Sequence, residues 1–289
     1  MKIHFLKTTW SDIIILQSDD KIALIDTGYE EQYQEIKSYL EKLKVKNISF
    51  ILLTHFHKDH YGSIKNIIKE FNVEKVYFKN YSCLDSTAAN GSIAVEKYRN
   101  SEYKKQNKIK ELIEEKSVLV EVENLNTIIF DKYTLKLFNN RNSIKEIYED
   151  TNYKNSYHKI LYNENQNSLA IFLKVNSKKI LLGGDIFDKE DEHPKANCVN
   201  YKIATSINEE IDIYKVPHHG TNNCNSIKTL DIYKPKIAVI TNGDEYLKNN
   251  SLIYNDLINA NKDVKILLTE KNNIVINILD NGDITYEKC

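Results

Sequence analysis

The segment SFILLTHFHKDHYGS, residues 49–63, constrains the fold more than any other part of the chain. Its apolar half, residues 50–53, has the length and composition of a buried strand. Its polar half then places three of the chain's eight histidines and one aspartate within residues 55–60. Metal-ligating residue types packed this densely after a buried strand predict a metal site at the end of a sheet.

The spacing of these residues indicates how they share metal ions. Residues i and i+2 of an extended segment point the same way, so the imidazoles of His55 and His57 can reach one ion. The chain should then turn into a helix capped at residues 62–63, which directs Asp59 and His60 towards a second ion. Two hydrolytic metal ions typically lie roughly 3.5–4 Å apart and share a bridging oxygen.

Two aspartates also follow apolar, strand-like segments. Asp26 ends such a segment in LIDTG, and we interpret it as a buried carboxylate that orients imidazoles, the alternative being a turn or helix cap. Asp185 follows KKILLGG, in which two glycines allow close backbone approach. A carboxylate at this point can bridge two cations, which a single imidazole cannot do. Asp188, in contrast, is expected to be a solvated residue at the start of a helix.

The segment YKVPHHGTNN, residues 214–223, again ends a strand and contains two adjacent histidines. Adjacent side chains of an extended segment point to opposite sides, so only one of His218 and His219 is expected to bind a metal ion. The other could hydrogen-bond a substrate oxyanion or act as an acid, and the spacing does not decide between them. We expect structural roles for the remaining histidines, which are His4, His158 and His193.

Composition excludes several other classes of protein. With 41% hydrophobic and 28% charged residues, the 289-residue chain can bury a sizeable core, and a net charge of −1 gives no bulk attraction to nucleic acid or anionic membranes. Four cysteines without CxxC spacing argue against a disulfide framework or a thiolate zinc site. The sequence contains neither a signal-peptide pattern nor an apolar run approaching the roughly 18 residues of a membrane span. A cytoplasmic location without a membrane partner is therefore expected.

Apolar and amphipathic segments alternate along the chain, which is typical of an α/β protein. The first strands are expected at residues 12–17, 21–28, 48–55 and 73–80. Helices are expected at residues 30–44 and 61–71, from about 93 to 116, and near 252–261. The middle of the chain is rich in strands, and LDNGDI predicts a terminal hairpin. Without repeats or a low-complexity linker, residues 1–289 should form a single domain, with excursions at about 80–116 and 139–167 that cover the site.

Taken together, Asp26, the HFHKDH motif, Asp185 and the pair His218-His219 resemble the motifs of the metallo-β-lactamase superfamily in order and separation. The resemblance extends over most of the chain, from Asp26 to about residue 240. It implies an α/β (α+β) fold, specifically a four-layer αββα sandwich, with a dinuclear metal site at one edge of the two sheets. Zinc is the usual metal, and manganese or iron are the alternatives.

The resemblance also implies a role for each motif residue. One metal ion would be bound by His55 and His57, and the other by Asp59, His60 and His219. Asp185 would bridge the two ions. His218 would face the substrate phosphate, and Asp26 would orient the histidine ligands.

Two branches of the superfamily look especially similar, on segments such as VNSKKILLGGD and KVPHHGTNN. They are the teichoic-acid phosphorylcholine esterase, which looks closer, and the nuclease-like domain of the competence protein for DNA uptake. Most superfamily hydrolases have a further histidine where this chain has Asn167 and Ser168, and both branches lack it. This departure leaves one metal ion with open positions that suit a phosphate. It counts against thioester hydrolases, lactonases and true β-lactamases, and Asp59 in place of glutamate counts against the oxygen-reducing di-iron branch.

The sequence thus predicts a dinuclear metallo-hydrolase that acts on ester bonds of a small phosphoester, chiefly a phosphoric diester, in the manner of a phosphorylcholine esterase. A hydroxide bridging the two metal ions would attack phosphorus, while His218 stabilises or protonates a phosphate oxygen. The first alternative is a metal-dependent nuclease, although the balanced charge does not favour nucleic acid as the partner. The second alternative is a non-catalytic binding or regulatory protein on the same fold. The oligomeric state stays unknown.

Overall fold

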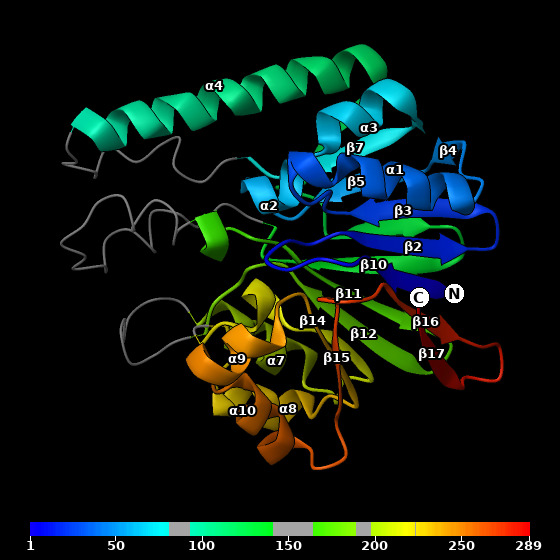
Figure 1. Cartoon of the computed structure of the whole chain (residues 1–289), viewed down its shortest axis with the longest axis vertical. Coiled ribbons are helices and arrows are strands. Elements are labelled where there is room, and N and C mark those ends of the chain that lie inside the picture. The colour runs from blue at the N-terminus through cyan, green and yellow to red at the C-terminus, as the bar shows by residue number, and fades with distance from the viewer. Residues whose placement is uncertain (81–92, 141–163, 189–197, 223) are drawn as a thin grey trace.

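The computed structural model describes the chain except for residues 81–92, 141–163, 189–197 and 223. Two large β-sheets lie face to face, and helices cover their outer surfaces (Figure 1). Residues 81–92 of the first predicted excursion and most of the second, together with His158 and His193, fall outside the described residues.

The first sheet contains eight strands in the order β17-β16-β1-β2-β3-β5-β7-β8. Their bounds are β1 Lys2–Phe5, β2 Ile14–Ser18, β3 Lys21–Ile25, β5 Phe50–Leu53, β7 Lys75–Phe78, β8 Val118–Glu121, β16 Ile274–Ile278 and β17 Ile284–Lys288. Strands β3, β5, β7 and β8 are parallel, so their carboxyl ends meet at one edge. Beside this sheet, β4 (Asn47–Ile48) pairs with β6 (Asn72–Val73). The chain's last two strands therefore complete the sheet that its first strands begin.

The second sheet contains seven strands in the order β15-β14-β13-β12-β11-β10-β9. Their bounds are β9 Thr127–Phe130, β10 Tyr133–Phe138, β11 Ala170–Val175, β12 Lys178–Gly183, β13 Ile213–Lys215, β14 Ile237–Ile240 and β15 Lys265–Leu268. Strands β12 to β15 are parallel, so this sheet also has an edge at which several carboxyl ends meet.

Helices form the two outer layers of the sandwich (Figure 1). On the first sheet they are α1 (Tyr33–Lys42), α2 (Lys58–Tyr61), α3 (Ile64–Glu70) and α4 (Ile93–Lys116), with the short 3₁₀ helix η1 (Glu30–Gln32) before α1. On the second sheet they are α7 (Val199–Ile207), α8 (Ile227–Tyr233), α9 (Asp244–Asn250) and α10 (Ile253–Ala260), with the 3₁₀ helix η3 (Pro217–Gly220). Among the described residues, no helix is both long enough and apolar enough to cross a membrane.

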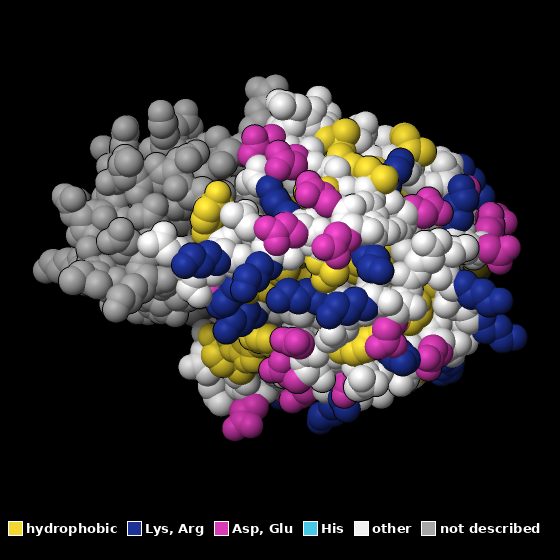
Figure 2. All heavy atoms as spheres, turned by 90° about the horizontal axis from the view of Figure 1, so that it is seen from above, with side chains coloured by type: hydrophobic (Ala, Val, Ile, Leu, Met, Phe, Trp, Pro, Cys, Tyr) yellow, Lys and Arg dark blue, Asp and Glu magenta, His cyan; other side chains and the backbone are white. Residues whose placement is uncertain are grey.

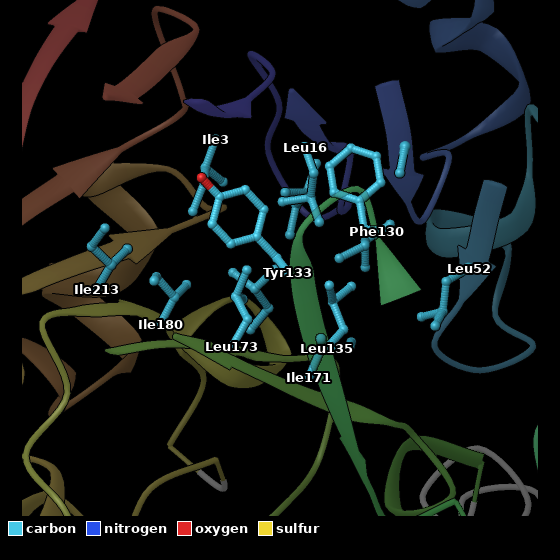
Figure 3. Close-up of a cluster of buried hydrophobic side chains, with 14 of the residues drawn as sticks. Ile3, Leu16, Leu52, Phe130, Tyr133, Leu135, Ile171, Leu173, Ile180 and Ile213 are labelled. Carbon is cyan, nitrogen blue, oxygen red and sulfur yellow. The ribbon is translucent and has the colours of Figure 1, made fainter. Parts of the chain in front are cut away.

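Three buried apolar clusters alternate with these layers. In β5, Phe50 and Leu52 face the cluster between the two sheets, whereas Ile51 and Leu53 face α1 and α3, because side chains of a strand alternate between its faces. Figure 3 shows part of the cluster between the sheets, where Leu16 and Leu52 of one sheet lie opposite Leu135 and residues near it in the other. The third cluster joins the second sheet to α7, α8 and α10. The predicted four-layer αββα sandwich is therefore confirmed.

Candidate metal centre

The predicted ligands converge where the carboxyl ends of parallel strands from both sheets meet. The first sheet supplies Asp26 after β3 and residues 55–60 after β5. The second sheet supplies Asp185 after β12 and His219 after β13. Asp59 and His60 lie within α2 itself, one turn earlier than the helix that the sequence predicts, and residues 62–63 separate α2 from α3.

The first group of ligand atoms belongs to Asp59, His60, Asp185 and His219. The distance between His60 Nε2 and Asp185 Oδ2 is 3.2 Å, and His219 Nε2 lies 3.2 Å from Asp59 Oδ2 and 3.7 Å from Asp185 Oδ2. One ligand atom from each of the four residues lies within 4.8 Å of all the others. Two imidazoles and two carboxylates at this separation can share one cation.

The second group comprises His55, His57 and Asp185, so Asp185 belongs to both groups. His55 Nε2 lies 3.7 Å from Asp185 Oδ2 and 3.0 Å from His57 Nδ1. Buried atoms of the centre, Asp185 Oδ1, His57 Nε2 and His60 Nε2, have no hydrogen-bond partner among the described residues. Leaving buried polar atoms unpaired costs free energy, and bound cations would relieve that cost. The residues therefore fit a pair of divalent metal ions.

The outward-facing ring nitrogens of two ligands are held by a short polar chain. His60 Nδ1 donates to Asp26 Oδ2 at 2.7 Å, and Asp26 also accepts from the backbone N–H and the hydroxyl of Thr54, at 2.8 and 2.7 Å. Because the Thr54 hydroxyl gives its proton to Asp26, it accepts from His55 Nδ1 at 3.1 Å. Asp26 has a φ of 59°, a left-handed conformation that is uncommon for a residue other than glycine. The carboxylate thus lies where the predicted orienting role requires it.

The segment that carries the adjacent histidines is not extended, so the alternation predicted for it is wrong. His218 and His219 have φ values of 46° and 53° within η3. This left-handed turn, rather than strand alternation, directs the two rings to different partners. His219 Nε2 points into the centre. His218 Nε2 accepts from the Asn165 amide at 3.1 Å, and His218 Nδ1 hydrogen-bonds the Thr221 hydroxyl at 2.5 Å. Burial lowers the pKa of His218 to about 4, so the ring is neutral at pH 7.

The charges of the centre balance one another even without metal ions. Burial acts to raise the pKa of Asp185 and of Asp59, but the neighbouring histidines, first His60 and then His219, together outweigh it and hold both pKa values well below their usual range. Conversely, burial acts to lower the pKa of His219, but Asp185 and Asp12 raise it to about 9. The carboxylates therefore attract protons onto His60 and His219, and divalent cations would replace those protons.

Sequence reasoning missed several residues that surround the ligands. They are Asp12, Asn165, Lys215 and Thr241, all buried. Asp12 directly precedes the apolar run of β2, and Lys215 ends the otherwise apolar strand β13. A charged residue next to or within a buried strand indicates that an oppositely charged residue is buried beside it.

Asp188 is not the solvated residue that the sequence predicts. It is 1% exposed, and its carboxylate accepts hydrogen bonds from Tyr201 N, Ser226 N, Ser226 Oγ and Thr229 Oγ1. The prediction failed because these donors come from α7 and α8, which follow it in the chain.

Comparison with known proteins agrees with the fold. Residues 11–125 match the family model described as the metallo-beta-lactamase superfamily. Among curated proteins, 66 residues are 32% identical to the alkyl/aryl-sulfatase BDS1 of Saccharomyces cerevisiae, over 22% of this chain but only 10% of that one.

Two solved structures are similar over nearly the whole chain. The metallo-beta-lactamase fold protein YhfI from Bacillus subtilis has a TM-score of 0.51 at 10% identity and covers 99% of both chains. The CmlA beta-hydroxylase E377D mutant has a TM-score of 0.52 at 10% identity, covering 92% of this chain and 52% of the other. At this identity the likeness concerns the fold alone.

Proposed function

Because this chain is a metallo-β-lactamase-fold protein whose residues 11–125 match the model of that superfamily, we propose that it is a metal-dependent hydrolase of small phosphoesters, chiefly phosphoric diesters. One observation carries the proposal: two groups of largely buried potential ligands share the carboxylate of Asp185. A shared carboxylate holds two cations close together, which is the arrangement that phosphoester hydrolysis uses.

Each residue of the centre has a proposed task. His55, His57 and Asp185 would hold one divalent cation, and Asp59, His60, Asp185 and His219 the other, with zinc expected first and manganese or iron as alternatives. Bound there, the two cations would lower the pKa of a water molecule and stabilise negative charge on the phosphoryl group. Asp26 and Thr54 orient the rings of His60 and His55 through the contacts described above. For His218 to contact a phosphate oxygen, its Nε2 would have to leave the Asn165 amide and carry the ring proton.

The segment before β11 supports a phosphoester substrate, because it lacks the additional histidine that most hydrolases of the superfamily have there. Ser168 Oγ accepts from the backbone N–H of Asp185 at 2.8 Å and lies 3.3 Å from His55 Nδ1, the ring nitrogen opposite the one that faces Asp185. Asn167 donates to the carbonyl of Asn80 at 2.9 Å. Neither side chain takes the place of a third imidazole. Among the described residues, the group of His55 and His57 is thus completed by Asp185 alone, which leaves room for phosphoryl oxygens.

A panel of esters tests the proposal. Purified protein loaded with Zn²⁺ or Mn²⁺ is assayed on bis(p-nitrophenyl) phosphate, p-nitrophenyl phosphorylcholine, p-nitrophenyl phosphate, cyclic nucleotides, short oligonucleotides and p-nitrophenyl sulfate. We expect hydrolysis of the phosphodiesters. Asp185→Asn should reduce it about 100-fold or more, since it removes a ligand rather than a group behind one. Asp283→Asn, on the exposed hairpin before β17, is the control and should retain activity.

Three results would contradict the proposal. Undiminished turnover by the Asp185→Asn variant would exclude the shared carboxylate from the reaction. Protein that binds two metal ions but cleaves only the sulfate ester would reject the phosphoester assignment. Protein that binds almost no zinc, manganese or iron would instead favour the non-catalytic alternative.

A nuclease is the second candidate, and one surface feature favours it. On the side of the molecule where α4 lies, Lys and Arg side chains form a row, with Asp and Glu side chains on both sides of it (Figure 2). Helix α4 supplies exposed lysines, among them Lys104 and Lys108. The oligonucleotide arm of the panel decides: metal-dependent cleavage faster than that of the small diesters would favour the nuclease, and cleavage that resists EDTA would reject its metal-dependent form.

A further inference from the structure

Lys215 is a buried cation that the proposed reaction does not use. It ends β13, its side chain is 1% exposed, and its Nζ donates to the carboxylate of Asp12. The same Nζ lies 3.4 Å from the carbonyl oxygens of Gly183 and Gly184 at the end of β12. A buried ammonium group is tolerated only when it is paired and hydrogen-bonded, so Asp12 is its counter-ion.

Asp12 carries this contact from one sheet to the other. It precedes β2 of the first sheet, whereas Lys215 belongs to the second, and the two residues are 203 positions apart in the chain. The second carboxylate oxygen, Asp12 Oδ1, accepts from the Thr241 hydroxyl at 2.7 Å. Lys215 therefore holds the Asp12 carboxylate in the orientation in which its Oδ1 accepts from Thr241.

The Thr241 hydroxyl fixes the proton on the ring of His219. A hydroxyl has a single proton, and here it is donated to Asp12, so the same oxygen accepts from His219 Nδ1 at 2.9 Å. Because the Nδ1 proton is held by Thr241, Nε2 is the nitrogen that faces Asp59 Oδ2 and Asp185 Oδ2, and a bound metal ion would replace the proton on it. This is the form in which an imidazole binds a metal ion.

We infer that Lys215, Asp12 and Thr241 are positioning residues that hold His219 as a metal ligand, an inference that rests on the proposed metal-dependent function. The ammonium of Lys215 also takes the place of a cation beside the third group of potential ligands, which consists of Asp12, Asp26 and His60. This fixed positive charge would oppose the binding of a third cation there.

Zinc affinity measured by competition with a chromogenic chelator tests the inference without reference to turnover. We expect two zinc ions in the wild type and a Thr241→Val variant that binds one of them about 10–100-fold more weakly. Thr241→Ser keeps the hydroxyl and should restore the affinity. Thr269→Val is the matched control: Thr269 is equally buried, follows the adjacent parallel strand β15, and donates to the carbonyl of Thr8 at 2.8 Å. It should bind both ions as the wild type does.

Lys215→Met and Asp12→Asn should weaken the binding of the same zinc ion. If either variant fails to fold, the Thr241 substitutions still decide the question. Wild-type affinities for both ions in Thr241→Val would overturn the inference. The inference would also be overturned if Thr241→Val lost affinity equally for both ions and its metal-free form melted at a lower temperature than that of Thr269→Val. That result would indicate general destabilisation. Wild-type protein that binds none of zinc, manganese and iron would reject the proposed function itself.

Discussion

Replacing Gly184 with alanine tests whether the centre depends on close approach of three strand ends. A Cβ atom at this position would lie 2.0 Å from Ser168 Oγ, 2.9 Å from the carbonyl oxygen of Leu169 and 3.0 Å from Thr54 Cβ. Non-bonded heavy atoms prefer roughly 3.5–4.0 Å, so all three neighbours must move. Rotating Ser168 alone does not suffice, because the other two contacts involve the backbone and a Cβ atom.

The expected cost follows from these contacts. Overpacking of this kind costs about 1–3 kcal/mol, and losing the hydrogen bond from the Asp185 N–H to Ser168 adds about 1 kcal/mol. At roughly 2 °C per kcal/mol for a chain of this length, the metal-free protein should melt about 4–8 °C lower. Binding of zinc to the group of His55 and His57 should also weaken, because Ser168 lies 3.3 Å from His55 Nδ1.

Differential scanning fluorimetry of chelator-treated protein, followed by zinc titration, measures both effects. The matched control is Gly243→Ala, whose Cβ would come no closer than 3.3 Å to the Glu270 carboxylate, the end of a flexible side chain. Its φ of −84° suits any residue, so its stability should stay within about 0.5 kcal/mol of the wild type. A Gly184→Ala variant that melts and binds zinc as the control does would refute the close packing of the strand ends.

Three further predictions concern residues away from the metal ligands. Burial lowers the pKa of His4 to about 4, so between pH 4 and 6.5 the unfolded chain binds more protons than the folded chain. The free energy of unfolding should therefore rise by up to about 3 kcal/mol as the pH increases across that range. Urea titrations at several pH values should show this rise in the wild type and a flatter dependence in His4→Gln. Leu52→Ala, at a position that is 0% exposed between the sheets, should cost about 2–5 kcal/mol by urea unfolding, whereas Leu252→Ala, 62% exposed, should cost less than about 0.5 kcal/mol. Asp188→Asn replaces a carboxylate oxygen with an amide group that donates, although four donors already face this side chain. The melting temperature should therefore fall by several degrees, whereas a solvated carboxylate would give no change.

The parts of the fold that local patterns determine could be predicted from the sequence. The strand pair at residues 12–28, the strand before the HFHKDH motif and the long helix from residue 93 to 116 all lie close to their predicted places. The strands are short apolar runs bounded by polar turn residues, and residues 93–116 form a long segment without Gly or Pro, so each is evident from neighbouring residues alone. The helices α7, α8 and α9, of only seven to nine residues, were not predicted.

The roles that depend on distant contacts could not be predicted. Asp12 looks like an ordinary residue before a strand until Lys215 is brought to it from the other sheet. The left-handed turn at His218 and His219 has no local sequence pattern of its own, because both residues are ordinary in an extended segment. Asp188 gains its donors only when α7 and α8 pack beside it.

The division of the ligands between two sheets has a consequence for how the protein responds to its surroundings. Residues 55–60 belong to one sheet and Asp185 and His219 to the other, so a bound cation would cross-link the two halves of the sandwich. A ligand that binds only the folded chain stabilises it by about 2.7 kcal/mol at a free concentration one hundred times its dissociation constant. The free energy of unfolding would therefore follow the free metal concentration, and chelation would lower the melting temperature by cutting the link between the two sheets.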